Sequence, residues 1–302
     1  MIVVAGGTGL LGRDLVSRLA GRGLEVRVVT RDPDRARAGW RDLPSEVQLV
    51  RGDVRDPASL GPVLAGAETV VAAVQGFGGR EAGGVGPVDR DGNVHLIQAA
   101  ARSGAHHLVL LSIRGASPDS PLSLGRAKSV AEAALATSGL RGTVIRPTAY
   151  METWGGLIGG SIIATGRARV FGRGLNPINF VAARDVAPIV EAAVVAPDGQ
   201  PATIDVVGPE DLTMLDLVAA FGRALGRDVP VSHVPRPMMR VLSTVFRPLR
   251  PVIADQIAAG LALDSVDLRA AGRGTVTGRT RFDEIAAAFV ADARPSLTPQ
   301  AG

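Results

Sequence analysis

A glycine-rich turn near the start of the chain constrains its fold more than any other feature. The apolar run Ile2–Ala5 leads into Gly-Gly-Thr-Gly-Leu-Leu-Gly, and a helical pattern of leucine and valine follows over residues 10–20. At this spacing in a strand–turn–helix unit, the glycines make a tight turn, admit a pyrophosphate to the main chain and let helix pack on strand. The helix N-terminus also favours anions. We therefore predict a dinucleotide site formed by Gly6, Gly7, Thr8, Gly9, Leu10, Leu11 and Gly12.

The first half of the chain continues as an alternation of short apolar runs and helical patterns. Strand-like runs lie at 25–30, 47–50, 69–74, 107–112 and 143–145, and helical patterns lie at 57–64, 88–103 and 122–138. Short buried strands that alternate with helices indicate βαβ units with right-handed crossovers. The predicted fold class is α/β, a doubly wound parallel (Rossmann) sheet with a smaller C-terminal substrate lobe.

The domain boundaries follow from changes in this rhythm. Residues 1–150 are expected to form the NAD(P)-binding Rossmann domain, to which 177–207 return as a strand, a helix and a strand. The glycine-rich segment 151–176 predicts a substrate loop with a short helix, and it joins 208–302 in the substrate lobe. Within that lobe, 211–225 predicts an amphipathic helix capped by Thr213 or Asp211. The tail 292–302 is expected to be loose.

The proline-interrupted segment 236–263 leaves two interpretations open. Its apolar residues are typical of the core of a small lobe or of a dimer face. The less favoured alternative is a helix on a membrane surface, where Arg240, Arg247 and Arg250 contact anionic lipid.

Composition excludes several classes of function. The 33 basic and 29 acidic residues give a net charge of +4, and the cations are scattered, which argues against nucleic acid as a partner. The chain has no cysteine, which excludes disulfides and thiolate chemistry. We find no metal-ligand spacing, no basic leader and no apolar run long enough to cross a bilayer. We therefore expect a cytoplasmic protein, monomer or homodimer, that acts on a small molecule.

The residues after the second and third strands select the nucleotide. The second run ends Val-Val-Thr-Arg-Asp, and Arg31 is placed to meet a 2′-phosphate, with Arg13 and Arg35 as further positive charges. This favours NADP; the alternative is NAD, with Asp32 on the ribose. Further cofactor contacts are expected from Asp53, Val54, Ala72 and Ala73, although Asp53 is equally suited to capping the helix near 56–57.

Several further motifs carry a family resemblance. Val-Asp-x-x-Gly-Asn at 88–93, Ala-Lys-x-x-x-Glu at 127–132 and Thr-Val-Ile-Arg-Pro at 143–147 accompany the glycine turn and Asp53. Together they resemble the short-chain dehydrogenase/reductase superfamily, and within it the atypical, NmrA-like NAD(P)H-binding branch, over residues 1–230. That branch includes quinone and other NAD(P)H reductases as well as cofactor sensors.

The sequence departs from the superfamily at its catalytic pair. The usual Tyr-x-x-x-Lys has Leu124 in the place of tyrosine, and Lys128, the one lysine of the chain, in its expected place. The resemblance implies that Lys128 binds the nicotinamide ribose; the alternative is a solvated cation paired with Glu132. Ser112 lies where the superfamily's serine region begins.

Tyr150, the one tyrosine, is expected in a loop, where it either contacts substrate or packs beneath Trp154. Lys128, Tyr150 and Ser112 are thus the candidate catalytic residues. The predicted function is NADP(H)-dependent hydride transfer to a small organic acceptor such as a quinone or conjugated carbonyl. The alternative is a non-enzymatic NADP(H)-sensing regulatory or assembly protein.

Overall fold

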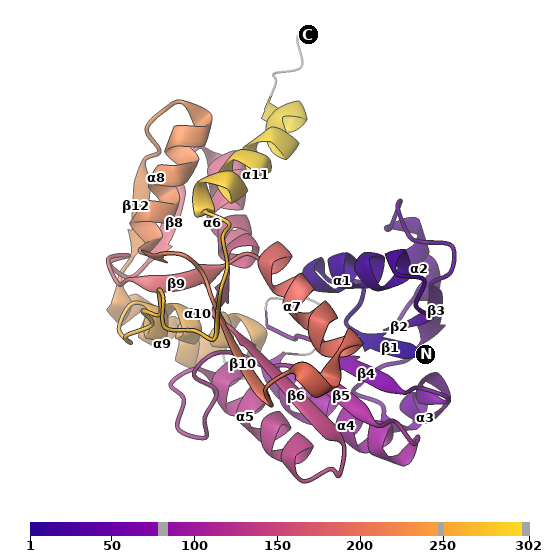
Figure 1. The fold of residues 1–302 in the computed structure, drawn as a ribbon. Helices are drawn as coiled ribbons and strands as arrows, with labels where there is room; N and C mark the ends of the chain where they lie inside the picture. Colours follow the sequence, from indigo (N-terminus) through magenta and orange to yellow (C-terminus); the bar gives the residue numbers. More distant parts are fainter. Residues whose placement is uncertain (78–83, 247–250, 298–302) are drawn as a thin grey trace. The chain divides into compact units, whose positions relative to one another are not determined.

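A computed structural model describes residues 1–77, 84–246 and 251–297. Two compact units divide the chain (Figure 1). The first consists of Met1–Pro147 with Arg184–Asp205, and the second of Thr148–Ala183 with Val206–Gly302. The segment 177–207 is therefore shared: residues 184–205 belong to the first unit, and 177–183 and 206–207 belong to the second.

The main sheet has eight strands in the order β13-β10-β6-β5-β4-β1-β2-β3. Parallel pairing joins β3, β2, β1, β4, β5 and β6 in succession, which confirms the predicted doubly wound sheet. The strands are β1 (Ile2–Ala5), β2 (Val26–Thr30), β3 (Gln48–Arg51), β4 (Thr69–Ala72), β5 (His107–Leu111), β6 (Arg141–Pro147), β10 (Thr203–Val207) and β13 (Val276–Thr277).

Helices cover both faces of this sheet (Figure 1). One face carries α1 (Leu10–Gly21) and α7 (Ala183–Val195); the other carries α3 (Leu60–Leu64), α4 (Asn93–Arg102) and α5 (Ser123–Ala136). Alternate strand residues such as Val3 and Val4 point to opposite faces, and both are fully buried. Burial on both sides is the reason that the strands are continuous apolar runs. Shorter elements are α2 (Pro33–Ala38), η1 (Pro57–Ser59), η2 (Val85–Gly92) and η3 (Pro197–Gly199).

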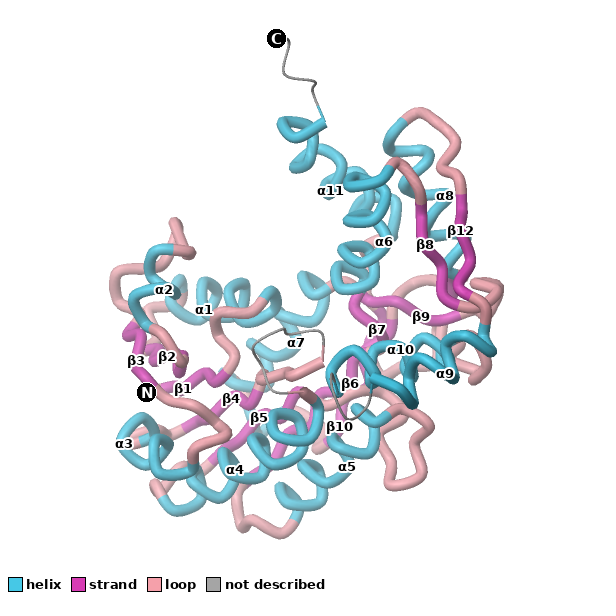
Figure 2. The backbone as a smooth tube through the Cα atoms, turned by 180° about the vertical axis from the view of Figure 1, so that it is seen from behind, coloured by secondary structure: helices cyan, strands magenta, loops and turns pink. Residues whose placement is uncertain are grey.

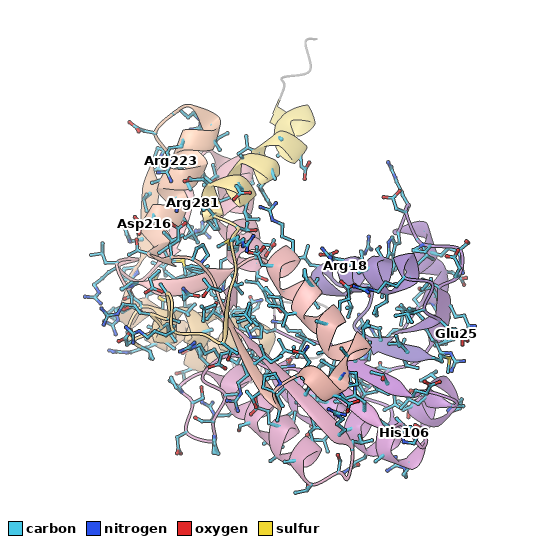
Figure 3. The ribbon with its side chains drawn as sticks, viewed as in Figure 1. Arg18, Glu25, His106, Asp216, Arg223 and Arg281 are labelled. Atoms are coloured by element: carbon cyan, nitrogen blue, oxygen red, sulfur yellow. The ribbon has the colours of Figure 1, made fainter. Side chains whose placement is uncertain are left out.

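A shared carboxylate ties α1 to α7. Arg18, labelled on α1 in Figure 3, places Nη1 3.5 Å from Glu191 Oε2, and Arg22 Nε donates to Oε1 of the same side chain. Glu191 on α7 is largely buried, so two cations offset its desolvation.

The second unit combines two small sheets with a helical core. One sheet has the order β11-β9-β7, and β8 pairs in parallel with β12 in the other, where the two strands lie side by side in Figure 2. Its elements are β7 (Ala149–Tyr150), α6 (Met151–Thr165), β8 (Ala168–Phe171), β9 (Ile178–Val181), β11 (Asp211–Leu212), α8 (Met214–Leu225), β12 (Val231–Val234), α9 (Arg236–Phe246), α10 (Pro251–Leu263) and α11 (Phe282–Leu297).

The prediction of a loop with a short helix at 151–176 is wrong in its main part, because α6 alone takes fifteen residues of it. The glycines serve packing rather than mobility. A Cβ at Gly159 would lie 2.6 Å from Phe221 Cζ and 2.8 Å from Phe289 Cε1, so only glycine admits these rings. Phe221 in turn meets Phe282 and Phe289 edge-on, with centroids 6.0 and 5.7 Å apart.

Two further predictions for the second unit have mixed outcomes. Thr213 caps α8 in a reciprocal capping box with Asp216. At the other end of α8, Arg223 pairs with Asp283 of α11 at 2.5 Å; Figure 3 labels Asp216 and Arg223 at these two ends of the helix. Asp211 belongs to β11 instead. The expected loose tail is wrong for residues 292–297, which continue α11, while 298–302 lie outside the described residues.

The segment 236–263 forms α9 and α10, which pack on each other. Met239 and Ile257 are buried, whereas Met238, Val241 and Val245 are exposed along α9. Arg240 is exposed, and Arg247 and Arg250 lie outside the described residues. In the described part of the chain, no helix combines the length and the apolar character needed to span a bilayer.

Candidate nucleotide site and its lysine

The glycine turn has the geometry that a diphosphate requires. Gly6 has a φ of +91°, and a Cβ there would collide with the carbonyl of Ala73; a Cβ at Gly12 would collide with the carbonyl of Gly6. Gly9 donates its N–H to Gly6 O at 3.0 Å and is the N-cap of α1 without a side-chain cap. The first-turn N–H groups of α1 have no intrahelical acceptor, and no acidic side chain lies in that turn. The turn is therefore built to receive an anion.

The other predicted residues of the turn differ in exposure. Leu10 is 58% exposed, whereas Leu11 is buried against the sheet. Arg13 donates from Nε to Thr8 O at 3.0 Å and from Nη1 to Gly39 O at 2.9 Å, and its guanidinium lies 5.3 Å from the centre of the Trp40 ring. These contacts fix the turn from outside.

The ends of β2 and β3 carry the residues expected at the adenosine side. Arg31 is exposed directly after β2. Asp32 accepts from the Arg35 N–H at 3.0 Å and so caps α2. That role engages Asp32 Oδ1.

Asp53 follows β3 and is paired within its own loop. Arg55 donates to it from Nε at 3.0 Å and from Nη2 at 2.5 Å, and this bond, with a smaller contribution from the Arg31 charge, lowers the pKa of the Asp53 carboxyl. The alternative that Asp53 caps the next helix is wrong, since Asp56 accepts from Ala58 N and caps η1.

Val54, Ala72 and Ala73 lie at the ends of β3 and β4, and Ala73 lies beside Gly6 of the turn. Val54 is buried against Gly92, where a Cβ would lie 2.7 Å from Val54 Cγ2. Ala72 is fully buried, and Ala73 donates its N–H to Ala5 O at 2.8 Å, which extends the β1–β4 pairing toward the turn.

Lys128 lies at the centre of the first unit rather than on its surface. Its side chain is 3% exposed, its Nζ lies 3.3 Å from Asp89 Oδ1, and it donates to Val74 O at 3.2 Å, just beyond the end of β4. The alternative of a solvated cation paired with Glu132 is therefore wrong. The side chain of Asp89 is fully buried and its Oδ2 accepts from Gly76 N at 2.9 Å, so the carboxylate links α5 to the loop that follows β4.

Asp89 lies within a wide helical turn, the π-helix η2. Such turns leave carbonyl groups without their usual partners, and here buried Asn93 donates to Val88 O at 3.3 Å and to Asp89 O at 2.9 Å. Burial raises the pKa of the Asp89 carboxyl, and the Lys128 charge opposes that rise. Asp89 belongs to the motif at 88–93 that carries the family resemblance, but we expected no particular role for it. The signal for a buried role was an acid seven residues before Leu96, on the apolar side of a helical pattern, in a chain with one lysine.

Ser112, directly after β5, belongs to a second polar network in the first unit. It is 3% exposed and its Oγ donates to Glu132 Oε1. Glu132 also accepts from Arg146 Nε at 2.9 Å and Nη2 at 2.5 Å, and this pairing raises the pKa of Arg146. Because the one hydroxyl proton goes to Glu132, Ser112 offers lone pairs, not a proton, to anything beside it.

Tyr150 lies in the second unit, in β7 rather than in the loop that we expected. It pairs with Val181 of β9 and immediately precedes α6. Burial, together with the negative charge of Glu152, raises the pKa of its phenol. Glu152 accepts from the Ala183 N–H at 2.9 and 3.1 Å at the start of α7. Among the residues that the structure describes, no cluster of three histidines and carboxylates could hold a metal ion.

A Rossmann sheet with an open glycine turn defines a dinucleotide-binding protein. Residues 6–194 match the family described as NAD(P)H-binding, and the chain belongs to that family. Membership confirms the prediction of an NAD(P)H-binding family and of a nicotinamide nucleotide as the cofactor.

Relatives of known function include reductases and an assembly factor. The chain is 29% identical over 235 residues to an NAD(P)H azoreductase of Xenophilus azovorans, covering 78% of this chain and 76% of that protein. It is 31% identical over 228 residues to a (4-alkanoyl-5-oxo-2,5-dihydrofuran-3-yl)methyl phosphate reductase of Streptomyces griseus, covering 75% and 74%. It is 27% identical over 248 residues to the photosystem II assembly factor Ycf39 of Synechocystis, covering 82% and 74%.

Among solved structures, the fold is similar to that of an NADPH-dependent quinone oxidoreductase of Escherichia coli complexed with NADPH. The TM-score is 0.74 at 20% identity, covering 96% of this chain and all of the other. At this identity the likeness establishes the fold.

Proposed function

We propose that this chain is an NADPH-dependent reductase that transfers hydride to a small conjugated acceptor such as a quinone. The observation that carries the proposal is the buried Lys128–Asp89 pair at the carboxyl edge of a sheet whose first turn is open to a diphosphate. In open α/β sheets, ligands bind at that edge.

Each part of the nucleotide has a proposed partner. The first-turn N–H groups of α1 hold the diphosphate. Arg31, exposed after β2, meets the 2′-phosphate and selects NADPH over NADH.

Lys128 is proposed to orient the nicotinamide end. An ammonium group has three N–H donors; one bonds Val74 O, and a second serves the ion pair in which Nζ lies 3.3 Å from Asp89 Oδ1. The third is available to a ribose hydroxyl, and the two protein contacts hold Nζ in place for it. The nicotinamide, when bound, supplies the hydride.

The class of acceptor follows from the small number of general acids in the first unit that could protonate the reduced acceptor. Leu124 replaces the usual tyrosine, and the Ser112 hydroxyl donates its hydrogen bond to Glu132. An acceptor suits this setting if its reduced anion is stable enough to take its proton from water. A quinone meets that condition: hydride brings two electrons and one proton, and water supplies the second proton of the hydroquinone. The names of the azoreductase and quinone oxidoreductase relatives support this class.

The second candidate is a non-enzymatic NADP(H) sensor or assembly protein. Leu124 in place of the tyrosine favours it, as does the similarity to an assembly factor. Both candidates share the nucleotide site, so turnover separates them.

The test measures NADPH oxidation by the purified chain with a panel of quinones, azo dyes and conjugated aldehydes. We expect turnover with at least one quinone. Arg31→Ala should weaken NADPH about 10- to 100-fold, the value of one charge-assisted hydrogen bond, and should leave NADH unchanged. Arg102→Ala, which removes an exposed arginine of α4, is the matched control. Tight NADPH binding without turnover on any acceptor would establish the sensor instead, and equal losses for the two nucleotides would refute the role of Arg31.

A further inference from the structure

The second unit contains a partly open cavity of about 250 Å³, lined by residues of α6, β8, β9, α8 and α10. Its walls are mainly apolar and include Trp154 and Leu157 from α6, Phe171 from β8, Met214 from α8 and Leu263 from α10. This volume lies just below the range of drug-sized sites, so it fits a compact ligand. Such concave, apolar walls with a few polar groups are typical of small-molecule sites.

One carboxylate, Asp264, directly after α10, supplies a polar group to the cavity wall. Its side chain is 2% exposed. Its Oδ1 accepts from the N–H groups of Arg173 and Gly174, both at 3.1 Å. Gly172 makes room for it, since a Cβ there would lie 2.6 Å from Oδ2.

The other oxygen of Asp264 is incompletely satisfied. Among the described residues Oδ2 has no hydrogen-bond partner, and it lies 3.6 Å from Arg173 Nε and 3.6 Å from Arg236 Nε. Arg236 Nε is likewise buried without a hydrogen-bond acceptor in the described part of the chain. A buried acceptor and a buried donor therefore face each other at a distance too long for a hydrogen bond.

We propose that this cavity binds a compact, mainly apolar molecule that carries a hydroxyl group. A hydroxyl donates one hydrogen bond, so it satisfies Oδ2 of Asp264, the carboxylate that lines the cavity. A carboxylate offers no proton to Oδ2, and an ammonium would lie close to two like charges, since Arg173 Nε and Arg236 Nε are each 3.6 Å from that oxygen. The apolar part of the ligand lies against Trp154, Leu157 and Phe171. This inference does not depend on hydride transfer, because every group that carries it belongs to the second unit.

The test uses straight-chain alcohols from butanol to octanol, titrated calorimetrically into the full chain without nucleotide. Each buried methylene should tighten binding about fourfold until the cavity is filled. In a Trp40→Phe background, Trp154 is the one tryptophan, and its emission should change with the same dissociation constant. Octanoate should bind at least tenfold more weakly than octanol.

Two variants and a control locate the site. Leu157 is 54% exposed and lines the cavity, so Leu157→Arg should cost at least tenfold in octanol affinity without loss of the fold. Val241, 63% exposed on α9, is not among the lining residues, so Val241→Arg should leave the affinity unchanged. Asp264→Asn should remove the preference for octanol over octanoate.

Several results would overturn the proposal. Affinities that do not rise with chain length, or equal losses in the Leu157 and Val241 variants, would show that alcohols do not enter this cavity. Tighter binding of octanoate than of octanol would show that Arg169, the arginine in the cavity wall, and not Asp264 recognises the polar end of the ligand. Because no nucleotide is present, an absence of reductase activity leaves this test unaffected.

Discussion

Removal of the Lys128 charge is the sharpest test of the buried pair. Lys128→Met keeps the length of the side chain but leaves the Asp89 carboxylate, which is fully buried, without its counter-charge. The Gly76 N–H at 2.9 Å stays as a partner. Breaking a buried pair from one side costs about 3–5 kcal/mol, because an uncompensated charge stays in the interior. We expect that loss in the free energy of unfolding at neutral pH.

The loss should depend on pH in a defined direction. In Lys128→Met, burial without an opposing cation keeps the pKa of Asp89 above its unfolded value. A carboxyl whose folded pKa is raised stabilises the fold fully below its unfolded pKa, and this contribution is lost as the pH rises through the folded pKa. The deficit of the variant should therefore shrink in mild acid and grow toward neutrality.

The double variant Lys128→Met/Asp89→Asn separates folding from function. It removes both charges and keeps an acceptor for Gly76 N, so its stability should return to within about 1–2 kcal/mol of the parent chain. Urea unfolding followed by circular dichroism measures all four members of the cycle. A single variant as stable as the parent, or a double variant as unstable as the single, would refute the coupling. NADPH turnover that survives in the stable double variant would show that Lys128 serves the fold alone.

Two smaller predictions concern other buried positions. Burial, reinforced by the Arg141 charge, lowers the pKa of His107, so its stabilising contribution is present above the unfolded value of about 6.5 and is lost as the pH falls through the folded pKa. His107→Gln should flatten acid unfolding in that range, whereas the exposed neighbour His106→Gln should not. Gly159→Ala should lower stability by about 1–3 kcal/mol through overpacking against Phe221, whereas Gly160→Ala, with open space, should raise it by up to about 1 kcal/mol; thermal melts decide both.

The strands of the first unit were predictable because a parallel sheet buries both of its faces. Each strand is then a continuous apolar run that ends at a turn residue, and β1, β2 and β5 match their predicted runs to within a residue. The helix α2 has six residues and one buried side chain, too little for a periodic pattern. α6 was missed for a different reason: its glycines lower helix propensity, and the rings of Phe221 and Phe289 that require them come from distant segments.

The candidate site was predictable where one segment carries it, and not where it depends on tertiary contacts. The glycine turn is local, so its spacing alone predicts its shape. The partner of Lys128 lies on another element, and the i+4 rule pointed to Glu132, which pairs with Arg146 instead. The i+4 spacing identifies side chains that are neighbours on a helix, but it does not show that the side of α5 that carries Lys128 is buried.

The three candidate catalytic residues share a property that limits the chemistry. The raised pKa of Tyr150 keeps its phenol protonated, the proton of Ser112 is held by Glu132, and the ammonium of Lys128 is held by Asp89 and Val74. Ser112 and Lys128 therefore already have protein partners in the structure, and Tyr150 stays in its protonated form. Alcohol oxidation needs a base at the hydroxyl, and sugar epimerisation needs one as well. Reduction of a conjugated acceptor needs no such base, because the ring or the extended π-system of the acceptor carries the new negative charge until water protonates it. Because these side chains are not free to act as bases, the site favours reduction of an acceptor over oxidation of an alcohol, and it favours an acceptor that stabilises its own anion.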